Sequence, residues 1–466
     1  MSLATFVSNL SVSQIKGLST TSVKNLDTAA VAALKTEHVA ALSSSQLAVI
    51  DNDEIESLKL SSLSTGALAG LTLGQLQKIN TSTEAGVALA SGQISGLSTG
   101  LISQLTSTEL DAFKTDQIKA LTSKQISALD ASQLSAASIA HLDAAQVGKL
   151  TSAQVTALGD AAAAALSSAQ IAGLSAAGAA GLQTQDIVAL FNDSTSGAAN
   201  LGALNSKAVA SLSTANIAAL DATGGGALTI DQIKSLTTDQ VAILTADEVS
   251  GWGTDKVAAL SSKQIQALNV AALDNTQAGA LTSAQIAVLS STQIGAISDT
   301  AFGAWSTDKL AAISAAGIAG LTAAQAGTLE TGDVNALNSK AFAALSTTHL
   351  AALDEDVVGG LSTDLVKVLT SAQIVALTDD QVTALTSAQI GVLSSSQIAA
   401  LEDGDIALFA TGEFAAISTA ALKGLQENDF MALTDAQIDE LTNGRVPSLT
   451  DDQTNWVVAA YNDTTV

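Results

Sequence analysis

The stretch "LTSAQIVALTDDQVTALTSAQIGVLSSSQIAAL", residues 369–401, repeats one eight-residue phrase four times. Each copy has a Leu, a Thr or Ser, two small or acidic residues, a Gln, a branched apolar residue, a variable residue and, in most copies, an Ala. We call this phrase an octad and number its positions from the Leu. An isolated helix of about two turns is unstable in water. The array of octads, rather than the single octad, must therefore be what folds.

The repeat occupies nearly the whole chain of 466 residues. The spacing of eight is unbroken from Leu273 to Leu449. Earlier runs with the same spacing cover residues 10–58, 63–79, 89–129, 142–190 and 204–268. We therefore predict an N-terminal cap at residues 1–9, an octapeptide-repeat solenoid at 10–449 and a C-terminal cap or docking segment at 450–466. Phase shifts near 58–63, 79–89, 129–142, 190–204 and 268–273 are expected to form loops or kinks within the solenoid.

Neither a continuous helix nor a simple strand fits this period. Eight residues of an α-helix advance by roughly 800°, so a Leu stripe would drift by about 80° in each octad. In a strand, the apolar positions one, six and eight would point to both faces. Ala, Gln and Leu favour helix over strand. Each octad is therefore expected to form its own short helix.

Position two supports a helix start in most octads. From Asp274 to Thr450, this position is Ser, Thr, Asp or Asn in 19 of 23 octads, and these residues are preferred N-caps. Glu330, Glu402, Ala410 and Gln426 are the exceptions. Gln or an acidic residue often follows three residues after the cap, which is the spacing of a capping box.

The remaining pattern predicts how the octads pack. On a short helix, position six and the next Leu are three residues apart and share one face. Position eight is mostly Ala or Gly, as at Ala280, Gly320 and Gly360, which would let neighbouring backbones approach closely. We expect an all-α, elongated solenoid of short capped helices built from octapeptide repeats. A β-solenoid is the structural alternative.

Composition limits the partners. The chain has 18 Lys and Arg against 44 Asp and Glu, a net charge of -26. Such a surface repels nucleic acid and anionic lipid. Polar residues interrupt every apolar stretch before it reaches about 18 residues, so membrane insertion is not expected.

The expected location is the cell exterior. Cysteine is absent, which excludes disulfides and thiolate metal sites. The acidic, Ser/Thr/Ala-rich composition is typical of extracellular proteins. The first residues, "MSLATFVSNLSVSQIKGL", lack a basic region followed by an apolar run, so export would proceed without a classical signal peptide.

The residues that carry chemistry form no catalytic pattern, and we expect no enzyme activity and no resident cofactor. His38 and His349 fall at position five, where Gln is usual, and are interpreted as capping residues. Acidic segments could ligate calcium through oxygen, although acids also favour helix starts, which we consider the better interpretation. The calcium candidates are Asp354, Glu355, Asp356, Asp403 and Asp405.

The phrase "LTSAQIxAL" resembles the Ala/Ser/Thr-rich short repeats of large bacterial surface proteins, including adhesins and surface-layer-like proteins that are exported without a cleaved N-terminal signal. The resemblance extends over nearly all of the chain, and it implies a bacterial protein at the cell surface. The wording "LTxxQVxAL" is also similar to the opening of the DNA-reading repeats of transcription activator-like effectors. Those repeats are much longer and basic, so we reject this second resemblance.

Two functional classes are consistent with these features. The favoured one is an extracellular structural protein that self-assembles into a fibre, sheet or surface layer, with copies of itself as partners. The alternative is an adhesin or binding scaffold for a protein, a cell-surface glycan or an ice surface. An enzyme with a site in a phase-shift loop is the least supported class.

Overall fold

The computed structural model describes residues 2–82, 88–191, 196–220, 222–402 and 404–464. Within these ranges the secondary structure consists of short α-helices and 3-10 helices, and it contains no strand. The predicted all-α repeat solenoid is thus confirmed, and the alternative β-solenoid is excluded for the described residues. Typical helices have four to six residues, such as α44 (Ser387–Ile390) and α47 (Thr411–Ala416). The last helix, α50 (Asp451–Thr464), has 14 residues.

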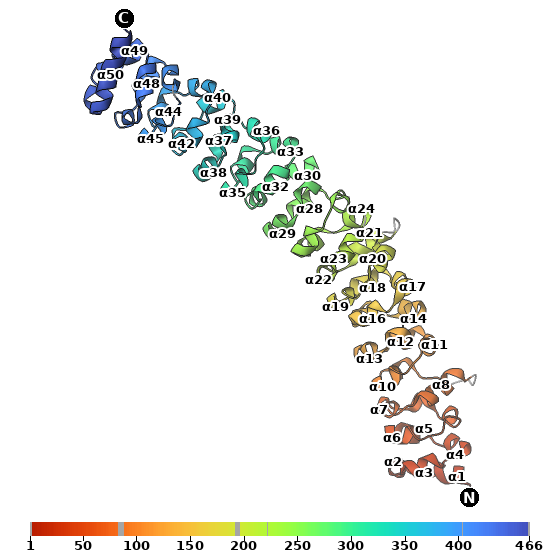
Figure 1. Cartoon of the computed structure of the whole chain (residues 1–466). Coiled ribbons are helices and arrows are strands. Elements are labelled where there is room, and N and C mark those ends of the chain that lie inside the picture. Colours follow the sequence, from red (N-terminus) through yellow and green to blue (C-terminus); the bar gives the residue numbers. More distant parts are fainter. Residues whose placement is uncertain (1, 83–87, 192–195, 221, 403, 465–466) are drawn as a thin grey trace. The chain divides into compact units, whose positions relative to one another are not determined.

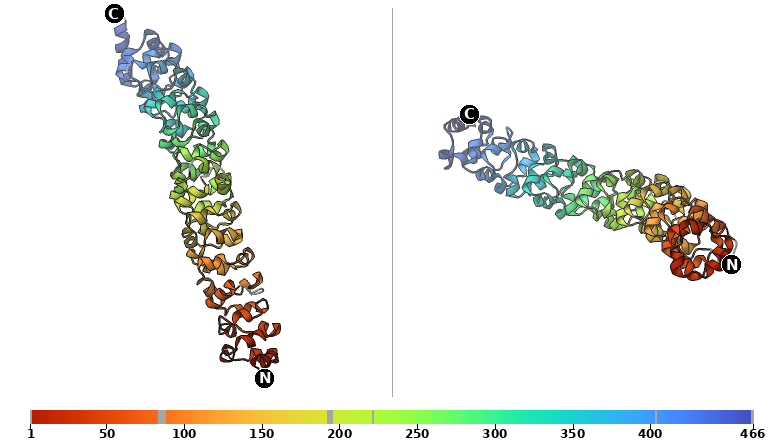
Figure 2. Two further views of the ribbon diagram at one scale, coloured as in Figure 1. Left: turned by 90° about the vertical axis from the view of Figure 1, so that its right-hand side faces the viewer. Right: turned by 90° about the horizontal axis from the view of Figure 1, so that it is seen from below.

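The chain divides into two compact units, Met1–Gln240 and Val241–Val466, which we describe separately. In both units, most helices pack against the helix that is third after them along the chain when the 3-10 helices are counted (Figure 1). Examples are α15 (Ala144–Val147) with α18 (Ser168–Gly173) in the N-terminal unit, and α44 with α47 in the C-terminal unit. Three repeats therefore complete one turn of the solenoid. The first turns of the N-terminal unit, seen end-on in Figure 2, form a ring of helices.

Capping starts the helices as predicted. At α44, the hydroxyl of Thr386 accepts a hydrogen bond from the backbone N–H of Gln389 at 3.4 Å. The Oε1 of Gln389 in turn accepts from the backbone N–H of Thr386 at 2.8 Å. This reciprocal pair is a capping box, which satisfies two of the donors that a helix start leaves unpaired. Equivalent pairs recur along both units.

The same Gln also links one turn of the solenoid to the previous one. Nε2 of Gln389 donates to the carbonyl oxygens of Val358 and Leu361, both at 2.9 Å. In the N-terminal unit, Nε2 of Gln154 donates to Ile126 and Leu129, both at 2.8 Å. We call these paired bonds the glutamine ladder. It also includes Gln46, Gln75, Gln93, Gln125, Gln146, Gln170, Gln232 and Gln240 in the N-terminal unit, and Gln277, Gln285, Gln293, Gln325, Gln381, Gln397, Gln437 and Gln453 in the C-terminal unit.

Burial follows the octad positions. Positions one, five and six are buried, as shown by Leu385, Gln389 and Ile390 at 2%, 2% and 0% exposure. Positions two, three, four and seven are mostly exposed. The octad pattern predicts only a capping role for position five, and the structure adds its burial and a second set of hydrogen bonds. A buried amide needs partners for its donors as well as its acceptor, and the ladder supplies them.

The five-residue steps keep the ladder in place. The steps at 58–63, 129–134 and 268–273 contain the 3-10 helices η2 (Leu60–Ser62), η3 (Ala131–Gln133) and η4 (Val270–Ala272). Gln285 reaches Leu260 across η4, 25 residues earlier, whereas Gln389 reaches a carbonyl 28 residues earlier. Each step therefore shortens one repeat by three residues without removing it from the turn. The shifts near 79–89 and 190–204 include residues outside the described ranges.

Small residues at position eight allow the turns to approach closely, as predicted. A Cβ placed on Gly320 would lie 1.9 Å from the carbonyl oxygen of Ser291 in the previous turn, and one on Gly181 would lie 2.2 Å from that of Ser152. Real Cβ atoms do not approach a carbonyl oxygen so closely. Gly332, by contrast, has nothing within 4 Å of its Cβ position.

We predict that Gly320→Ala destabilises the C-terminal unit, because the new methyl group must push two turns apart. Gly332→Ala is the control, and it should stabilise the protein by up to about 1 kcal/mol because Ala is the better helix former. Urea unfolding followed by circular dichroism measures both changes. A pair of substitutions with the same sign would contradict the close approach at Gly320.

A second prediction concerns the ladder. Gln389→Glu retains an acceptor for the cap, but it removes the two donors and places a carboxylate against two carbonyl oxygens. The free energy of unfolding should fall by about 1 to 3 kcal/mol, the usual cost of buried polar groups left unpaired. Ser387→Ala, on the same helix at exposed position three, is the control. Equal unfolding midpoints for Gln389→Glu and the control would show that the ladder contributes nothing.

Candidate functional site

The calcium candidates that the structure describes lie at or near the starts of two helices of the C-terminal unit. Asp354 is the N-cap of α40 (Glu355–Gly359), and its carboxylate accepts from the backbone N–H of Asp356 at 2.9 Å. Glu355 and Asp356 are exposed in the first turn of this helix. Asp405 is buried and accepts from the backbone N–H of Glu402 at 2.8 Å. Asp403 lies outside the described residues.

The two acidic segments belong to one column of stacked helices. The column contains α37 (Thr331–Ala336), α40, α43 (Asp379–Thr383), α46 (Asp405–Leu408), α48 (Glu427–Ala432) and α50, each packed on the next. Asp379 and Asp380 lie on α43, between the segments that sequence analysis treated as separate. None of the six octads in the column contains Lys or Arg.

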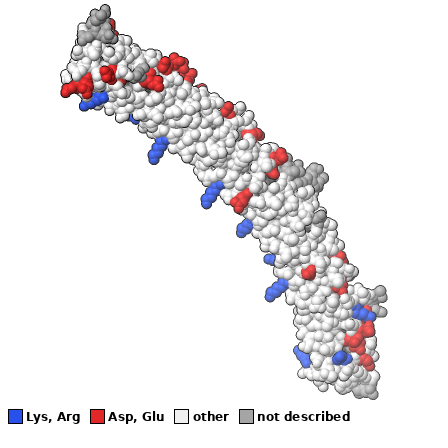
Figure 3. All heavy atoms as spheres, in the orientation of Figure 1, with Lys and Arg blue, Asp and Glu red and all other residues white. Residues whose placement is uncertain are grey.

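Charge is unevenly distributed in the C-terminal unit. Residues 241–466 contain 26 Asp and Glu against 7 Lys and Arg. On the face shown in Figure 3, most basic side chains of this unit lie along one edge, and many acidic side chains lie along the opposite edge. Lys367 pairs locally with Asp364 at 3.1 Å, and both side chains are exposed.

Metal clusters and membrane-spanning helices are both absent from the described residues. Across the described ranges, no group of three or more His, Asp or Glu side chains is arranged to hold a metal ion. In the same part of the chain, no helix combines the length and apolar character that crossing a bilayer requires. Helix-start acids therefore stay the favoured interpretation of the candidates, and calcium binding stays the untested alternative.

The histidines occupy repeat positions. Nδ1 of His38 accepts from the backbone N–H of Lys35, and Nδ1 of His349 accepts from that of Ser346, both at 3.3 Å. Each imidazole thus replaces the Gln oxygen in a capping box. His141 lies apart from both, with Nδ1 at 3.0 Å from the hydroxyl of Thr115.

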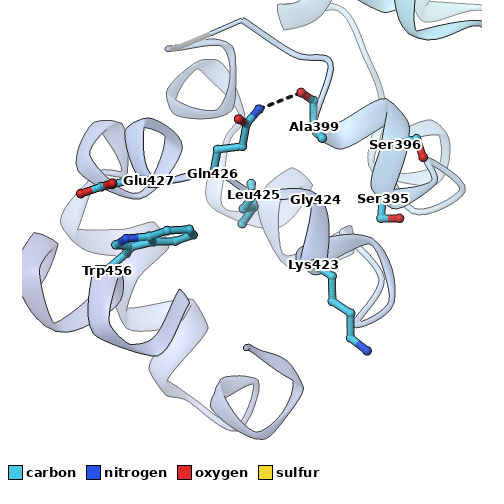
Figure 4. A pocket seen from close by; sticks show the side chains of 9 residues that line it. All are labelled: Ser395, Ser396, Ala399, Lys423, Gly424, Leu425, Gln426, Glu427 and Trp456. Carbon is cyan, nitrogen blue, oxygen red and sulfur yellow. Dashed lines mark hydrogen bonds between the residues drawn. The ribbon is translucent and has the colours of Figure 1, made fainter. Parts of the chain in front are cut away.

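The C-terminal unit contains a pocket of about 580 Å³. It lies between α45 (Ser395–Ile398), the 3-10 helix η5 (Ala421–Gly424), α48 and α50. Figure 4 shows the indole of Trp456 on one side, Ser395 and Ser396 on the other, and Leu425 between them. The volume falls within the roughly 300–1,000 Å³ typical of small-molecule sites.

Two departures from the repeat build this pocket. Trp456 stands at position eight of its octad, where Ala or Gly is usual, and Gln426 stands at position two, where Ser or Thr is usual. The indole is half-buried and packs against Phe430, with ring centroids 5.8 Å apart. Nε2 of Gln426 donates to the carbonyl oxygen of Ala399 at 2.9 Å (Figure 4). The sequence shows Gln426 as an exception at position two, but the octad pattern alone does not place it near Trp456.

Several polar side chains of the pocket remain available. Ser395, Ser396, Lys423 and Glu427 make no side-chain hydrogen bond or ion pair with any other described residue. Gly424 lines the pocket and packs against Ser395, and a Cβ there would lie 2.0 Å from the Ser395 carbonyl oxygen. The absence of a side chain at Gly424 therefore allows η5 and α45 to approach closely beside the pocket.

Comparisons with known proteins support the repeat character. A family model described as the ALTTAQ repeat matches residues 7–44 and 326–363, one stretch in each unit. A comparison with curated protein sequences found no match. The chain is thus similar to this repeat family over two stretches, and the solenoid described above shows how such repeats pack.

Acidic residues at position five predict a pH dependence. Burial raises the pKa of Asp405, and the nearby carboxylates of Glu402 and Asp379 raise it further. Burial also raises the pKa of Glu54, whose Oε2 has no hydrogen-bond partner among the described residues. Because both pKa values are raised by folding, each carboxylate opposes folding at neutral pH, and the penalty disappears as the group protonates in acid.

We therefore expect Glu54→Gln and Asp405→Asn to raise the unfolding midpoint at pH 7, because an amide is neutral and adds the donors of the ladder. The gain should shrink as the pH falls through the raised pKa values. Thermal unfolding at several pH values tests this expectation. Glu355→Gln, at an exposed position three, should change little at any pH, and a gain that persists unchanged in acid would refute the assignment.

Proposed function

We propose that the protein is an extracellular structural repeat protein that assembles with copies of itself into a fibre, sheet or surface layer, without enzymatic activity. The main observation behind this proposal is that the same octad positions are exposed in successive repeats. Positions one, five and six are taken up by the core and the glutamine ladder, and the exposed positions recur in every turn. A surface contact available at one turn is therefore available again at the next.

This geometry favours assembly by many weak contacts. Once two copies touch at one turn, further equivalent contacts form at high effective concentration, so modest interactions add up. The exposed positions are rich in Ser, Thr and Ala. Burying hydroxyl and methyl groups costs less desolvation than burying charges. The absence of cysteine and the resemblance to bacterial surface repeats support the extracellular location.

Charge sets a condition for assembly. The C-terminal unit has a large acidic excess, so two copies repel each other at low ionic strength. Salt reduces this repulsion, because the Debye length falls from about 30 Å at 0.01 M to about 8 Å at 0.15 M. Assembly should therefore strengthen as salt rises.

The first test measures assembly of the full chain by sedimentation and negative-stain electron microscopy, across ionic strength and with calcium or chelator. We expect ordered assemblies at physiological ionic strength and fewer at low ionic strength. A chain that stays monomeric in every condition would overturn the proposal.

Two deletions then test whether assembly depends on the columns. The helices of every third octad stack into a column, so the solenoid has three columns. Deleting residues 369–376 removes one octad and moves every later octad into the neighbouring column, which rotates its surface by a third of a turn. Deleting residues 353–376 removes three octads and restores the columns. Both variants keep the caps and the ladder spacing, so helicity should be retained. We expect the single deletion to impair assembly and the triple deletion to preserve it; equal assembly by both would exclude a role for column register.

A binding scaffold is the second candidate function. The pocket at Trp456 favours it, because the indole stands at position eight, where the repeat ordinarily has Ala or Gly, and it lies beside polar side chains. Binding without assembly would favour this candidate over the first.

A further inference from the structure

We propose that the pocket between α45, η5, α48 and α50 binds a neutral saccharide. This proposal rests on the second candidate function and is independent of self-assembly. It names the ligand class from three features of the pocket: one aromatic plate, a mixed set of hydrogen-bonding groups and a balanced local charge.

Trp456 supplies the plate. Its indole contacts Phe430 and also lines the pocket, as Figure 4 shows. A half-buried indole presents a flat apolar surface that is held in place by its neighbour. The C–H face of a pyranose ring is flat and apolar, whereas its edge carries hydroxyl groups, so the plate fits the face and leaves the edge for polar contacts.

The polar groups match hydroxyls. The side chains of Ser395 and Ser396 both donate and accept, while Oε1 of Gln426 accepts. A hydroxyl group is the ligand group that can satisfy either kind of partner, since it also both donates and accepts. Ligands with only donors or only acceptors would leave part of this set unpaired, which is costly in a desolvated site.

Charge favours a neutral ligand. Lys423 and Glu427 line the pocket together and cancel in net charge. Asp451 and Asp452 lie in the first turn of α50, close in sequence to Trp456, and disfavour an anionic ligand. The ammonium group of Lys423 would repel a cationic peptide, and the experiment below compares this second class of ligand with saccharides.

The test titrates the full chain with chitotriose, cellotriose and maltotriose and follows tryptophan fluorescence. Trp252 and Trp305 are 3% and 4% exposed, so they provide a constant background. We expect a saturable change with at least one trisaccharide. In Trp456→Phe, which keeps an aromatic ring against Phe430, the affinity measured by calorimetry should fall about tenfold or more. Trp305→Phe should bind like the parent.

A matched pair of serines provides a second test that does not depend on the core. The octads "LSSSQIAA" at 393–400 and "LSSSQLAV" at 42–49 begin with the same five residues. Ser396→Ala should weaken binding several-fold, whereas Ser45→Ala, at the same octad position in the N-terminal unit, should leave it unchanged.

Three results would overturn the proposal. One is the absence of binding to all three trisaccharides. Another is binding that both Trp456→Phe and Ser396→Ala leave unchanged. The third is tighter binding of oligolysine than of any trisaccharide, which would assign the pocket to cationic peptides. Assembly is measured separately by sedimentation, so failure of saccharide binding is distinguishable from failure of self-assembly.

Discussion

A single buried amide connects the local and the long-range structure of this protein. Oε1 of Gln389 accepts from the cap of its own helix, and Nε2 donates to two carbonyl oxygens of the previous turn. A helix this short is unstable alone, and its start is completed by the same side chain that fixes it to its neighbour. Because the ladder recurs through both units, each turn depends on the next, as expected for solenoids stabilised by nearest-neighbour interfaces.

This dual role explains what sequence analysis could and could not predict. The caps, the short helices and the close approach at Gly320 follow from local chemistry, and they are confirmed. The number of repeats per turn depends on which carbonyls face the Gln side chain, and an octad phrase does not contain that information. One feature of the sequence does indicate the ladder. A capping box can use either Glu or Gln, so the frequent occurrence of Gln at position five indicates that hydrogen-bond donors are needed there.

The ladder also explains why the spacing can change without loss of the fold. Gln285 reaches Leu260 across a shortened repeat, and Asn216 reaches Leu182 across a longer one, 34 residues earlier. In both cases the acceptor is the position-one residue three repeats back. Turn geometry is therefore set by the number of repeats and not by the number of residues. Insertions and deletions confined to one repeat can change the surface while the core remains in register.

Departures from the repeat consequently divide into two kinds. At position five, Asp405 and Glu54 replace the amide with a carboxylate. Burial disfavours the charged form of each carboxylate, which lowers the stability of the fold at neutral pH. Trp456 and Gln426 instead replace exposed or small residues and create a pocket with unpaired polar groups. Residues that depart from the repeat pattern without stabilising the fold are candidates for a functional role. In a chain whose recurring positions serve the fold, specific recognition is best sought at such departures, and the pocket at Trp456 brings two of them together.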